Sequence, residues 1–360
     1  MPEVTQQQKG ASSSAMSVRA KIGASTVTTQ VWLLIKGMRP RQWTKNILVF
    51  AGITFAGRLL DGVSLVRALV AFAVFCLLAG ATYLINDLAD LEQDRVHPIK
   101  RYRPLASGRL AKRTVYSGIA ASLLLALTGI ALIIALPLPA SHNIYHLALT
   151  LWPPHATFMI DNHVLPGDTY TAFGGSGALF AFLAVAYFAL MLAYTFRLKH
   201  IVLLDVFAIA AGFVLRAMAG AVAVAVHISP WLYLCTILLS LFLALGKRRQ
   251  ELLSLEHNAS AHRRILSEYT PQLLDQLITV VTSATIMAYS LYTFQGETGD
   301  RRLMVTIPFV LYGIFRYLYL VYARGEGGSP EEILLRDAHV RWSVVLCAIT
   351  VALVLYVLPS

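Results

Sequence analysis

The sequence predicts an all-α membrane protein, a bundle of nine transmembrane helices. Hydrophobic residues make up 57% of the 360 positions and charged residues only 14%, whereas soluble domains are about 45–50% apolar and about 25% charged. Apolar segments long enough to cross a bilayer recur along the chain, and Lys and Arg gather in alternate connections between them. This composition excludes a disordered protein, a disulfide scaffold and a soluble nucleic-acid binder, so no nucleic-acid partner is expected.

The N-terminal residues 1–35 are mostly polar, small and aperiodic. They contain too little apolar area to offset the entropy of ordering, so we expect a disordered cytoplasmic tail. No apolar run precedes Val31, and a cleavable signal peptide is therefore not expected.

Residues 36–358 form the predicted membrane domain, which is also the catalytic domain. A spanning helix needs roughly 20 mostly apolar residues, and the nine qualifying segments are approximately 43–60, 65–86, 115–136, 176–196, 203–226, 230–246, 273–295, 305–323 and 342–358. The first and the sixth are short. The proline-rich connection 137–175 is predicted to be an extracytoplasmic loop insertion.

The basic residues orient the bundle. With the N-terminus in the cytoplasm, 24 of the 30 Lys and Arg residues fall in the tail and in the even-numbered connections. The 137–175 connection contains no Lys or Arg, as expected of an exported loop. The positive-inside rule therefore predicts a multi-pass protein of the cell (inner) membrane with a cytoplasmic N-terminus and an extracytoplasmic C-terminus.

An acidic motif follows the second predicted helix at its cytoplasmic end. Asp87, Asp90 and Asp94 are spaced i, i+3 and i+7, which places three like charges on one face of a continuing helix. A divalent cation would remove their repulsion, and oxygen ligands, including the amide of Asn86, suit Mg²⁺. The alternative is a solvated acidic helix end that nearby basic residues neutralise.

Basic residues follow the acidic motif directly. Residues 97–109 contain two prolines, which stop the helix and stiffen the loop. Cations beside metal-binding carboxylates are the groups needed to hold a diphosphate. A cationic run at a membrane surface also serves as a topology signal or a lipid contact, but the neighbouring aspartates favour the diphosphate. The candidate cations are Lys100, Arg101 and Arg103.

Further candidate residues lie at other inner helix ends and within one span. The groups at the inner ends are Lys45 and Asn46 before the first helix, Tyr194, Lys199 and Asp205 between the fourth and fifth, and Lys247 and Arg248 after the sixth. Arg216 lies about three turns into the fifth helix, and an intramembrane charge is usually buried, paired and functional. A snorkelling anchor is its alternative. Arg316 in the eighth helix is equally open to both interpretations.

These motifs resemble the UbiA-type intramembrane prenyltransferase superfamily, and within it the decaprenyl-phosphate phosphoribosyltransferase branch. The segments that carry the resemblance are NDLADLEQDRVHPIKRYRPLASG, RPRQWTKN, YTFRLKHIVLLDVFAIAAGFVLRAMAGA, LGKRRQEL and SPEEILLRD. The chain departs from the family pattern in two respects, and one of them is that its 137–175 segment is longer than expected. The other concerns the aromatic prenyltransferases. Where they have a second DxxxD, it has Tyr194, Leu198 and Lys199, followed by the single Asp205.

The resemblance implies a membrane enzyme that transfers a 5-phosphoribosyl group. The donor would be 5-phosphoribosyl 1-diphosphate, the acceptor a polyprenyl (decaprenyl) phosphate, and the cofactor Mg²⁺, in a reaction that supplies a precursor of cell-wall arabinan. The alternative within the superfamily moves a polyprenyl group from its diphosphate to a small acceptor. A transporter or lipid flippase is a third interpretation, but it would require paired charges near the bilayer midplane. The sequence leaves a homo-oligomer open.

The resemblance also suggests roles for the candidate residues. Asp87, Asp90 and Asp94 would hold Mg²⁺ and the leaving diphosphate, with Asn86 orienting the ligands. Lys100, Arg101 and Arg103 would neutralise the donor phosphates. The acceptor phosphate or the donor 5-phosphate would be bound by Lys45, Tyr194, Lys199 and Lys247, and substrate contacts are also assigned to Asn46, Arg216 and Arg248. Asp205 is also assigned a substrate contact, with a pairing to Lys199 or to Arg216 as its structural alternative.

Overall fold

The computed structural model describes residues 27–136, 176–226, 230–256, 268–295, 301–326 and 330–357, and every regular element in these ranges is helical. The elements of the first range are α2 (Val27–Gly37), the 3₁₀ helix η1 (Pro40–Phe50), α3 (Ala51–Phe55), α4 (Gly62–Ala89), α5 (Leu91–Val96), the 3₁₀ turn η2 (Lys100–Tyr102) and α6 (Lys112–Ala135). The others are α8 (Ser176–Phe196), the 3₁₀ turn η3 (Leu198–His200), α9 (Leu204–Ala223), α10 (Pro230–Glu256), α11 (Pro271–Gln295), η5 (Arg301–Thr306), α12 (Ile307–Ala323), α13 (Pro330–Arg336), α14 (Ala338–Ala352) and a final π turn (Leu353–Val357). The predicted 137–175 loop lies outside the described residues.

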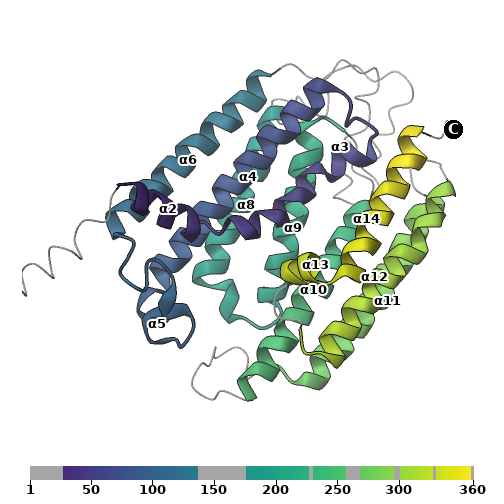
Figure 1. The fold of residues 1–360 in the computed structure, drawn as a ribbon. Helices are drawn as coiled ribbons and strands as arrows, with labels where there is room; N and C mark the ends of the chain where they lie inside the picture. The colour runs from purple at the N-terminus through teal and green to yellow at the C-terminus, as the bar shows by residue number, and fades with distance from the viewer. Residues whose placement is uncertain are drawn as a thin grey trace, which may run out of the picture.

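The long helices form one bundle, with α6 at one edge and α11 and α12 at the other (Figure 1). Its first core lies between α4, α8 and α9, where the Phe75 ring contacts Phe180 and Tyr187 at centroid distances of 6.3 and 5.0 Å. A second core joins α10, α11 and α12 around Phe242 and Tyr317, whose rings lie 5.1 Å apart. The prediction of an all-α membrane protein is thus confirmed in its helical class.

Among the described residues, seven helical segments are long and apolar enough to cross a membrane. They correspond to the second, third, fourth, fifth, seventh, eighth and ninth predicted spans, so the count of nine is not confirmed. The sixth prediction falls on α10, which continues to Glu256 instead of ending near residue 246. The basic residues predicted to follow this helix are therefore part of it.

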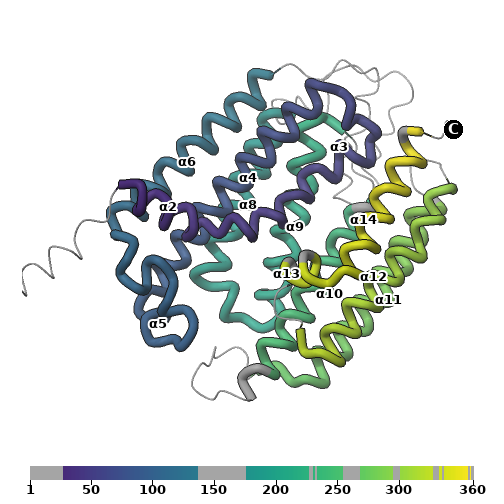
Figure 2. The backbone as a smooth tube through the Cα atoms, viewed as in Figure 1, coloured from purple at the N-terminus to yellow at the C-terminus, as the bar shows by residue number. Residues whose placement is uncertain are grey.

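The first predicted span, 43–60, is not one α-helix. It consists of the eleven-residue η1 followed by the five-residue α3, which the purple tube in Figure 2 follows from α2 toward α4. This segment packs closely on α9: a Cβ atom added to Gly220 would lie 1.9 Å from the Val49 carbonyl oxygen, and one added to Gly52 would lie 2.7 Å from Ala221 Cα. Two backbones in contact leave no room for side chains between them.

Replacing Gly220 by Ala is therefore expected to lower the free energy of unfolding by about 2–3 kcal/mol, because the new methyl group meets backbone that cannot rotate away. SDS titration of the purified protein would measure the loss. Gly62→Ala is the matched control, since nothing lies within 4 Å of a Cβ added there. Equal stability of the two variants would contradict the close contact between η1 and α9.

Residues 27–35, expected to be part of a disordered tail, belong to helix α2. The Gln30 side chain accepts a hydrogen bond from the Ala111 N–H (3.0 Å) and donates one to the Arg109 carbonyl (2.9 Å). The Leu34 side chain lies over Gly118 of α6. These tertiary contacts order a segment whose own composition gave little reason for a helix. The rest of the expected tail, residues 1–26, lies outside the described residues.

Near the N-terminal end of α4, the fully buried Arg67 contacts three other helices. Its Nε donates to the Ala223 carbonyl of α9 (2.5 Å), and its Nη1 donates to the carbonyls of Ile133 (3.0 Å) and Leu136 (2.7 Å) at the end of α6. Its Nη2 lies 3.5 Å from Ser176 Oγ at the start of α8. The partial negative charges at the C-termini of two helices thus stabilise this buried cation.

Candidate functional site

The acidic motif lies where α4 ends and α5 begins. Asp90 is the residue between the two helices, yet its N–H still donates to the Asn86 carbonyl (2.9 Å), and its own carbonyl accepts from the Asp94 N–H (2.8 Å). The helical path therefore continues closely enough to keep Asp87 and Asp94 on one side. Both carboxylates are buried, with 5% and 3% of the residue exposed.

Two arginines hold Asp87 and Asp94. Arg103 Nη1 lies 3.2 Å from Asp87 Oδ1 and 2.5 Å from Asp94 Oδ2, so both carboxylates converge on one guanidinium nitrogen. Arg39 Nη2 lies 2.5 Å from the same Asp87 oxygen, and its guanidinium stacks on the Tyr83 ring at 4.8 Å. The site therefore brings together two carboxylates and two guanidinium groups from three segments of the chain.

Asp90 faces a different partner. Lys199 Nζ of η3 lies 2.8 and 3.1 Å from its two carboxylate oxygens, and Asn86 Nδ2 donates to the second of them at 3.1 Å. Lys199 is buried, with only 5% of the residue exposed. The pair links the end of α4 to the connection between α8 and α9.

The His97 side chain stabilises the loop that carries Arg103. Its Nδ1 accepts hydrogen bonds from the backbone N–H groups of Ile99 and Lys100, both at 3.2 Å, which requires a ring without a proton on Nδ1. Burial, together with the positive charge of Lys100, lowers the pKa of His97 below 6.5. The acceptor form is thus the stable one at neutral pH.

The first basic residues of this loop are arranged differently from Arg103. Arg101 is exposed, and its guanidinium stacks on the Tyr102 ring at 4.9 Å. Lys100 lies on η2, Lys45 on η1 and Lys247 on α10. The phosphate-binding roles of these four basic residues stay predictions.

A second charged cluster lies at the start of α9. Asp205 is fully buried; its Oδ2 accepts from Arg248 Nε (2.5 Å) and its Oδ1 from the Tyr269 hydroxyl (2.8 Å). Burial, and the hydrogen bond to this carboxylate, raise the pKa of Tyr269 well above its usual value, so the hydroxyl keeps its proton. Arg248 also pairs with Glu251 and lies 3.3 Å from the Tyr194 hydroxyl.

Both predicted partners of Asp205 were wrong. Lys199 lies three residues after the end of α8 and faces Asp90, while Arg216 lies three turns further along α9. The partners that the structure shows, Arg248 and Tyr269, come from α10 and from the residues before α11. Contacts between helices that are distant in sequence decide this pairing.

Arg216 is buried inside the bundle, as predicted, but the contacts described for it are to neutral groups. It donates to Asn46 Oδ1 (2.7 Å), to the Tyr187 hydroxyl (2.7 Å) and to the Gly212 carbonyl (2.9 Å), and its guanidinium stacks on the Tyr187 ring at 4.6 Å. It is not a snorkelling anchor. Arg316 pairs with Asp337, which caps α14, at 2.8 Å.

Asp87 and Asp94 are the two carboxylates that could hold a divalent cation, with substrate oxygens completing its coordination. In the ranges that the structure describes, no group of three His, Cys, Asp or Glu residues is arranged to hold a metal ion. The two carboxylates nevertheless direct oxygens to one point, which Arg103 Nη1 occupies. Mg²⁺ is commonly bound by one or two carboxylates together with water and substrate phosphates. That Asp90 and Asn86 join such a site stays a prediction.

Sequence reasoning missed two residues of the site, Arg39 and Tyr269. Arg39 lies in the quoted RPRQWTKN segment, but its left-handed backbone, with φ of 55°, aims the side chain in a way that spacing does not show. Tyr269 precedes Pro271 in a segment without any motif. A tyrosine near a helix N-terminus gives no sequence signal of its own.

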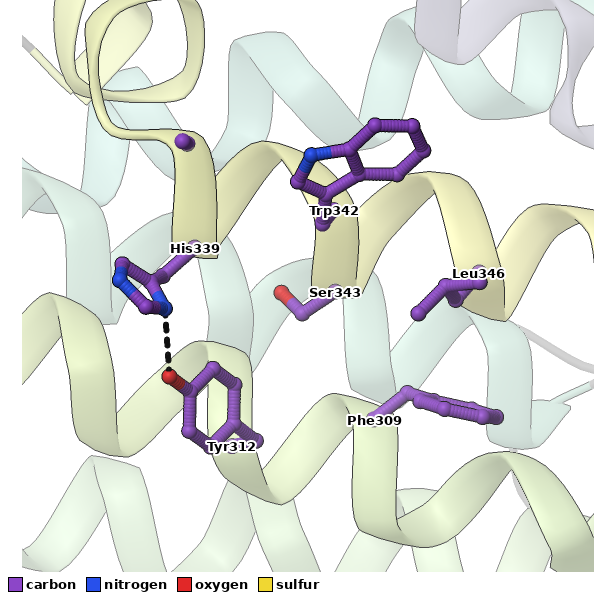
Figure 3. Close-up of a pocket in the computed structure, with 7 residues that line it drawn as sticks. Phe309, Tyr312, His339, Trp342, Ser343 and Leu346 are labelled. Atoms are coloured by element: carbon purple, nitrogen blue, oxygen red, sulfur yellow. Dashed lines mark hydrogen bonds between the residues drawn. The ribbon is translucent and has the colours of Figure 1, made fainter.

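A groove between α12 and α14 lies apart from these residues (Figure 3). Phe309, Trp342 and Leu346 make up its apolar lining, and the Tyr312 hydroxyl meets His339 Nδ1 at 2.9 Å. None of the residues that line it belongs to the predicted site.

Comparisons with known proteins agree with the motifs. Residues 46–153 match the model of the UbiA prenyltransferase family. The chain is 33% identical to the decaprenyl-phosphate phosphoribosyltransferase of Corynebacterium glutamicum over 333 residues, which cover 91% of this chain and 87% of that protein. It is also 33% identical to the enzyme of the same name from Mycolicibacterium smegmatis over 337 residues, 89% of this chain and 92% of that one.

The fold is that of a solved UbiA homolog from Archaeoglobus fulgidus bound to DMAPP and Mg²⁺. The TM-score is 0.61 and the sequence identity 16%, with 90% of this chain and 99% of that chain covered. The fold and the full-length relatives agree with the resemblance of the motifs. The chain is an integral membrane protein that belongs to the UbiA prenyltransferase family, with decaprenyl-phosphate phosphoribosyltransferases among its full-length relatives.

Proposed function

We propose that this protein transfers a 5-phosphoribosyl group from 5-phosphoribosyl 1-diphosphate to a polyprenyl phosphate and releases diphosphate. The observation that carries the proposal is a cluster of two carboxylates and two guanidinium groups at the junction of α4 and α5. Asp87 and Asp94 meet Arg39 and Arg103, whereas Asp205 is already neutralised by Arg248. The full-length relatives are named for this activity.

The same observation disfavours the alternative, transfer of a polyprenyl group from its diphosphate. That reaction, with metals on both sides of the diphosphate, would need a second set of free carboxylates. Asp205 is the acidic residue nearest in sequence to where that set would lie, and both of its oxygens are engaged by Arg248 and Tyr269. A site with one acidic and several basic groups suits one diphosphate and one phosphate monoester.

The chemistry requires little proton transfer. A phosphate oxygen of the acceptor forms the new bond to ribose C1 while the bond from C1 to the diphosphate breaks, and the diphosphate leaves with the electron pair. The acceptor is already an anion at neutral pH, so no general base is required. Catalysis therefore depends on positioning and on stabilising the charge of the leaving group.

Each residue of the site would bind a different part of the substrates or the metal ion. Arg39 and Arg103 would bind the donor diphosphate once its charge competes for them with Asp87 and Asp94. These two carboxylates would then be free to hold Mg²⁺, which neutralises the leaving diphosphate when bound. Lys199 would bind the acceptor phosphate or the donor 5-phosphate, and Arg216 would hold the Asn46 side chain in place.

The proposal also includes nine membrane crossings and their orientation. A 3₁₀ helix rises about 2.0 Å per residue, so η1 and α3 together are about 30 Å long, enough for the hydrocarbon core. With α10 they would complete nine crossings, in an inner membrane with the acidic site at the cytoplasmic face, where the basic residues gather. The water-soluble phosphoribosyl donor would reach the site from there.

Purified protein in lipid nanodiscs, supplied with ribose-labelled donor, polyprenyl phosphate and Mg²⁺, tests the proposal. Label should move into the lipid fraction and diphosphate should be released. In a parallel reaction the label is placed on a polyprenyl diphosphate and small acceptors are supplied. Transfer of that label, without ribose transfer, would establish the alternative function.

The His97 contacts predict a dependence on pH. Because folding lowers the pKa of His97, the ordered loop is fully favoured above about 6.5 and is weakened as the pH falls through that value. The KM for the phosphoribosyl donor should therefore rise at about pH 5.5. His97→Asn supplies a side-chain oxygen at the same place that does not titrate. Its rise in KM should be smaller than that of the parent enzyme, and equal rises would contradict this role.

A further inference from the structure

We propose that Tyr269 is a positioning residue, whose hydroxyl holds the connection between α8 and α9 so that the Lys199 ammonium stays at Asp90. The part of the inference that concerns substrate rests on the proposed function, in which Lys199 binds a phosphate. The part that concerns the loop does not. Tyr269 lies outside residues 46–153, which match the family model.

The Tyr269 hydroxyl bridges two groups at the start of α9. It accepts a hydrogen bond from the Leu203 backbone N–H at 2.8 Å and donates one to Asp205 Oδ1 at 2.8 Å. Only 3% of Tyr269 is exposed, and its ring packs in the core that contains Val206 and Leu274. Packing of the ring therefore fixes the position of the hydroxyl, which can in turn hold the Leu203 backbone.

Leu203 needs this support because its backbone is strained. Its φ of 66° and ψ of −41° lie in a region that residues with a side chain rarely adopt. Its side chain is 40% exposed, so packing alone provides little restraint. Such a conformation persists when neighbouring contacts determine it, and the bond to Tyr269 is one such contact.

The strained residue controls where Lys199 lies. Only a few residues separate Leu203 from η3, which carries Lys199, and the start of η3 follows directly from α8. The Lys199 ammonium must reach across to α4 to lie 2.8 and 3.1 Å from the oxygens of Asp90. A change of backbone conformation at Leu203 would therefore move the ammonium away from Asp90.

Asp205 also fixes the position of the Tyr269 hydroxyl. Its other oxygen accepts from Arg248 Nε at 2.5 Å, so the carboxylate is held by α10 as well as by Tyr269. The path from the core to the site thus runs through Tyr269, Leu203 and Lys199. Each step in this path is a hydrogen bond or a short length of backbone.

Limited proteolysis tests the loop without relying on activity. Trypsin can cut after Lys199 only when the connection opens. In Tyr269→Phe the cleavage rate at this site, followed by mass spectrometry on the full-length protein, should rise about tenfold. Tyr289→Phe is the matched control, because that hydroxyl bonds Thr306 at 2.6 Å, far from η3 in the chain. Cleavage of Tyr269→Phe within about twofold of the parent would overturn the proposal.

A double-mutant cycle tests the action through Lys199. Tyr269→Phe should raise the KM for the anionic substrate that Lys199 binds and lower kcat/KM about tenfold, but change it less than about twofold when Lys199→Met is already present. Equal losses in both backgrounds would show a general structural role and overturn the proposal. If the parent transfers no phosphoribosyl group, the proposed function fails, and the cleavage rate still decides the role of Tyr269.

Discussion

Replacing both Asp87 and Asp94 by Asn is expected to lower phosphoribosyl transfer about 10³-fold, the largest effect on activity that the structure predicts. These carboxylates converge on a single nitrogen of Arg103. Without them no pair of oxygens is directed to one point for Mg²⁺, and the leaving diphosphate loses its neutralising charge. The measurement is the transfer rate at saturating donor, repeated over a series of Mg²⁺ concentrations.

Glu92→Gln is the control for this pair of substitutions. Glu92 lies on the same short helix but is exposed and pairs with Arg95 at 2.9 Å, so its transfer rate should stay within about twofold of the parent. A double Asn variant that folds and keeps more than about a tenth of the activity would remove the metal-binding assignment.

The largest effect on stability is expected from Asp205→Ala, which should lower the free energy of unfolding by about 3–5 kcal/mol. Asp205 and Arg248 are both fully buried, and their side chains meet at 2.5 Å. Removing the carboxylate leaves a buried guanidinium with one remaining acid, Glu251, and removes the acceptor of the Tyr269 hydroxyl. SDS titration would measure the loss.

The neutral double variant Asp205→Asn, Arg248→Gln separates the cost of an unpaired charge from the loss of packing. Replacing both partners of a buried ion pair costs less than removing one, so about half of the stability lost in Asp205→Ala should return. If the double variant were less stable than Asp205→Ala, the unpaired charge would not be the cause.

The spacing of the aspartates predicted part of the site correctly. The i, i+7 relation placed Asp87 and Asp94 on one face, and the structure keeps them there because the backbone hydrogen bonds continue through Asp90. Spacing did not show that Asp90 turns to Lys199, 109 residues away. That contact depends on where η3 comes to lie, which local sequence does not determine.

For the membrane-spanning helices too, local sequence predicted some features, and others depend on tertiary contacts. Hydropathy identified α4, α6, α8 and α9 within a few residues, because lipid-facing and buried helix surfaces are both apolar. It did not show that most of the first predicted span is a 3₁₀ helix, or that the backbone of this helix contacts Gly220. It also missed α2, whose order comes from the Gln30 contacts with the start of α6.

The Arg67 contacts have a consequence for which end of the bundle can move. One guanidinium ties the N-terminal part of α4 to the ends of α6 and α9 and to the start of α8. At the opposite end of α4, the aspartates form ion pairs with Arg39, Arg103 and Lys199. The contacts at the Arg67 end are buried hydrogen bonds to backbone carbonyls of two helices. We therefore expect the Arg67 end of the bundle to stay fixed, and any movement that admits a ligand to occur at the end of α4 that carries the aspartates.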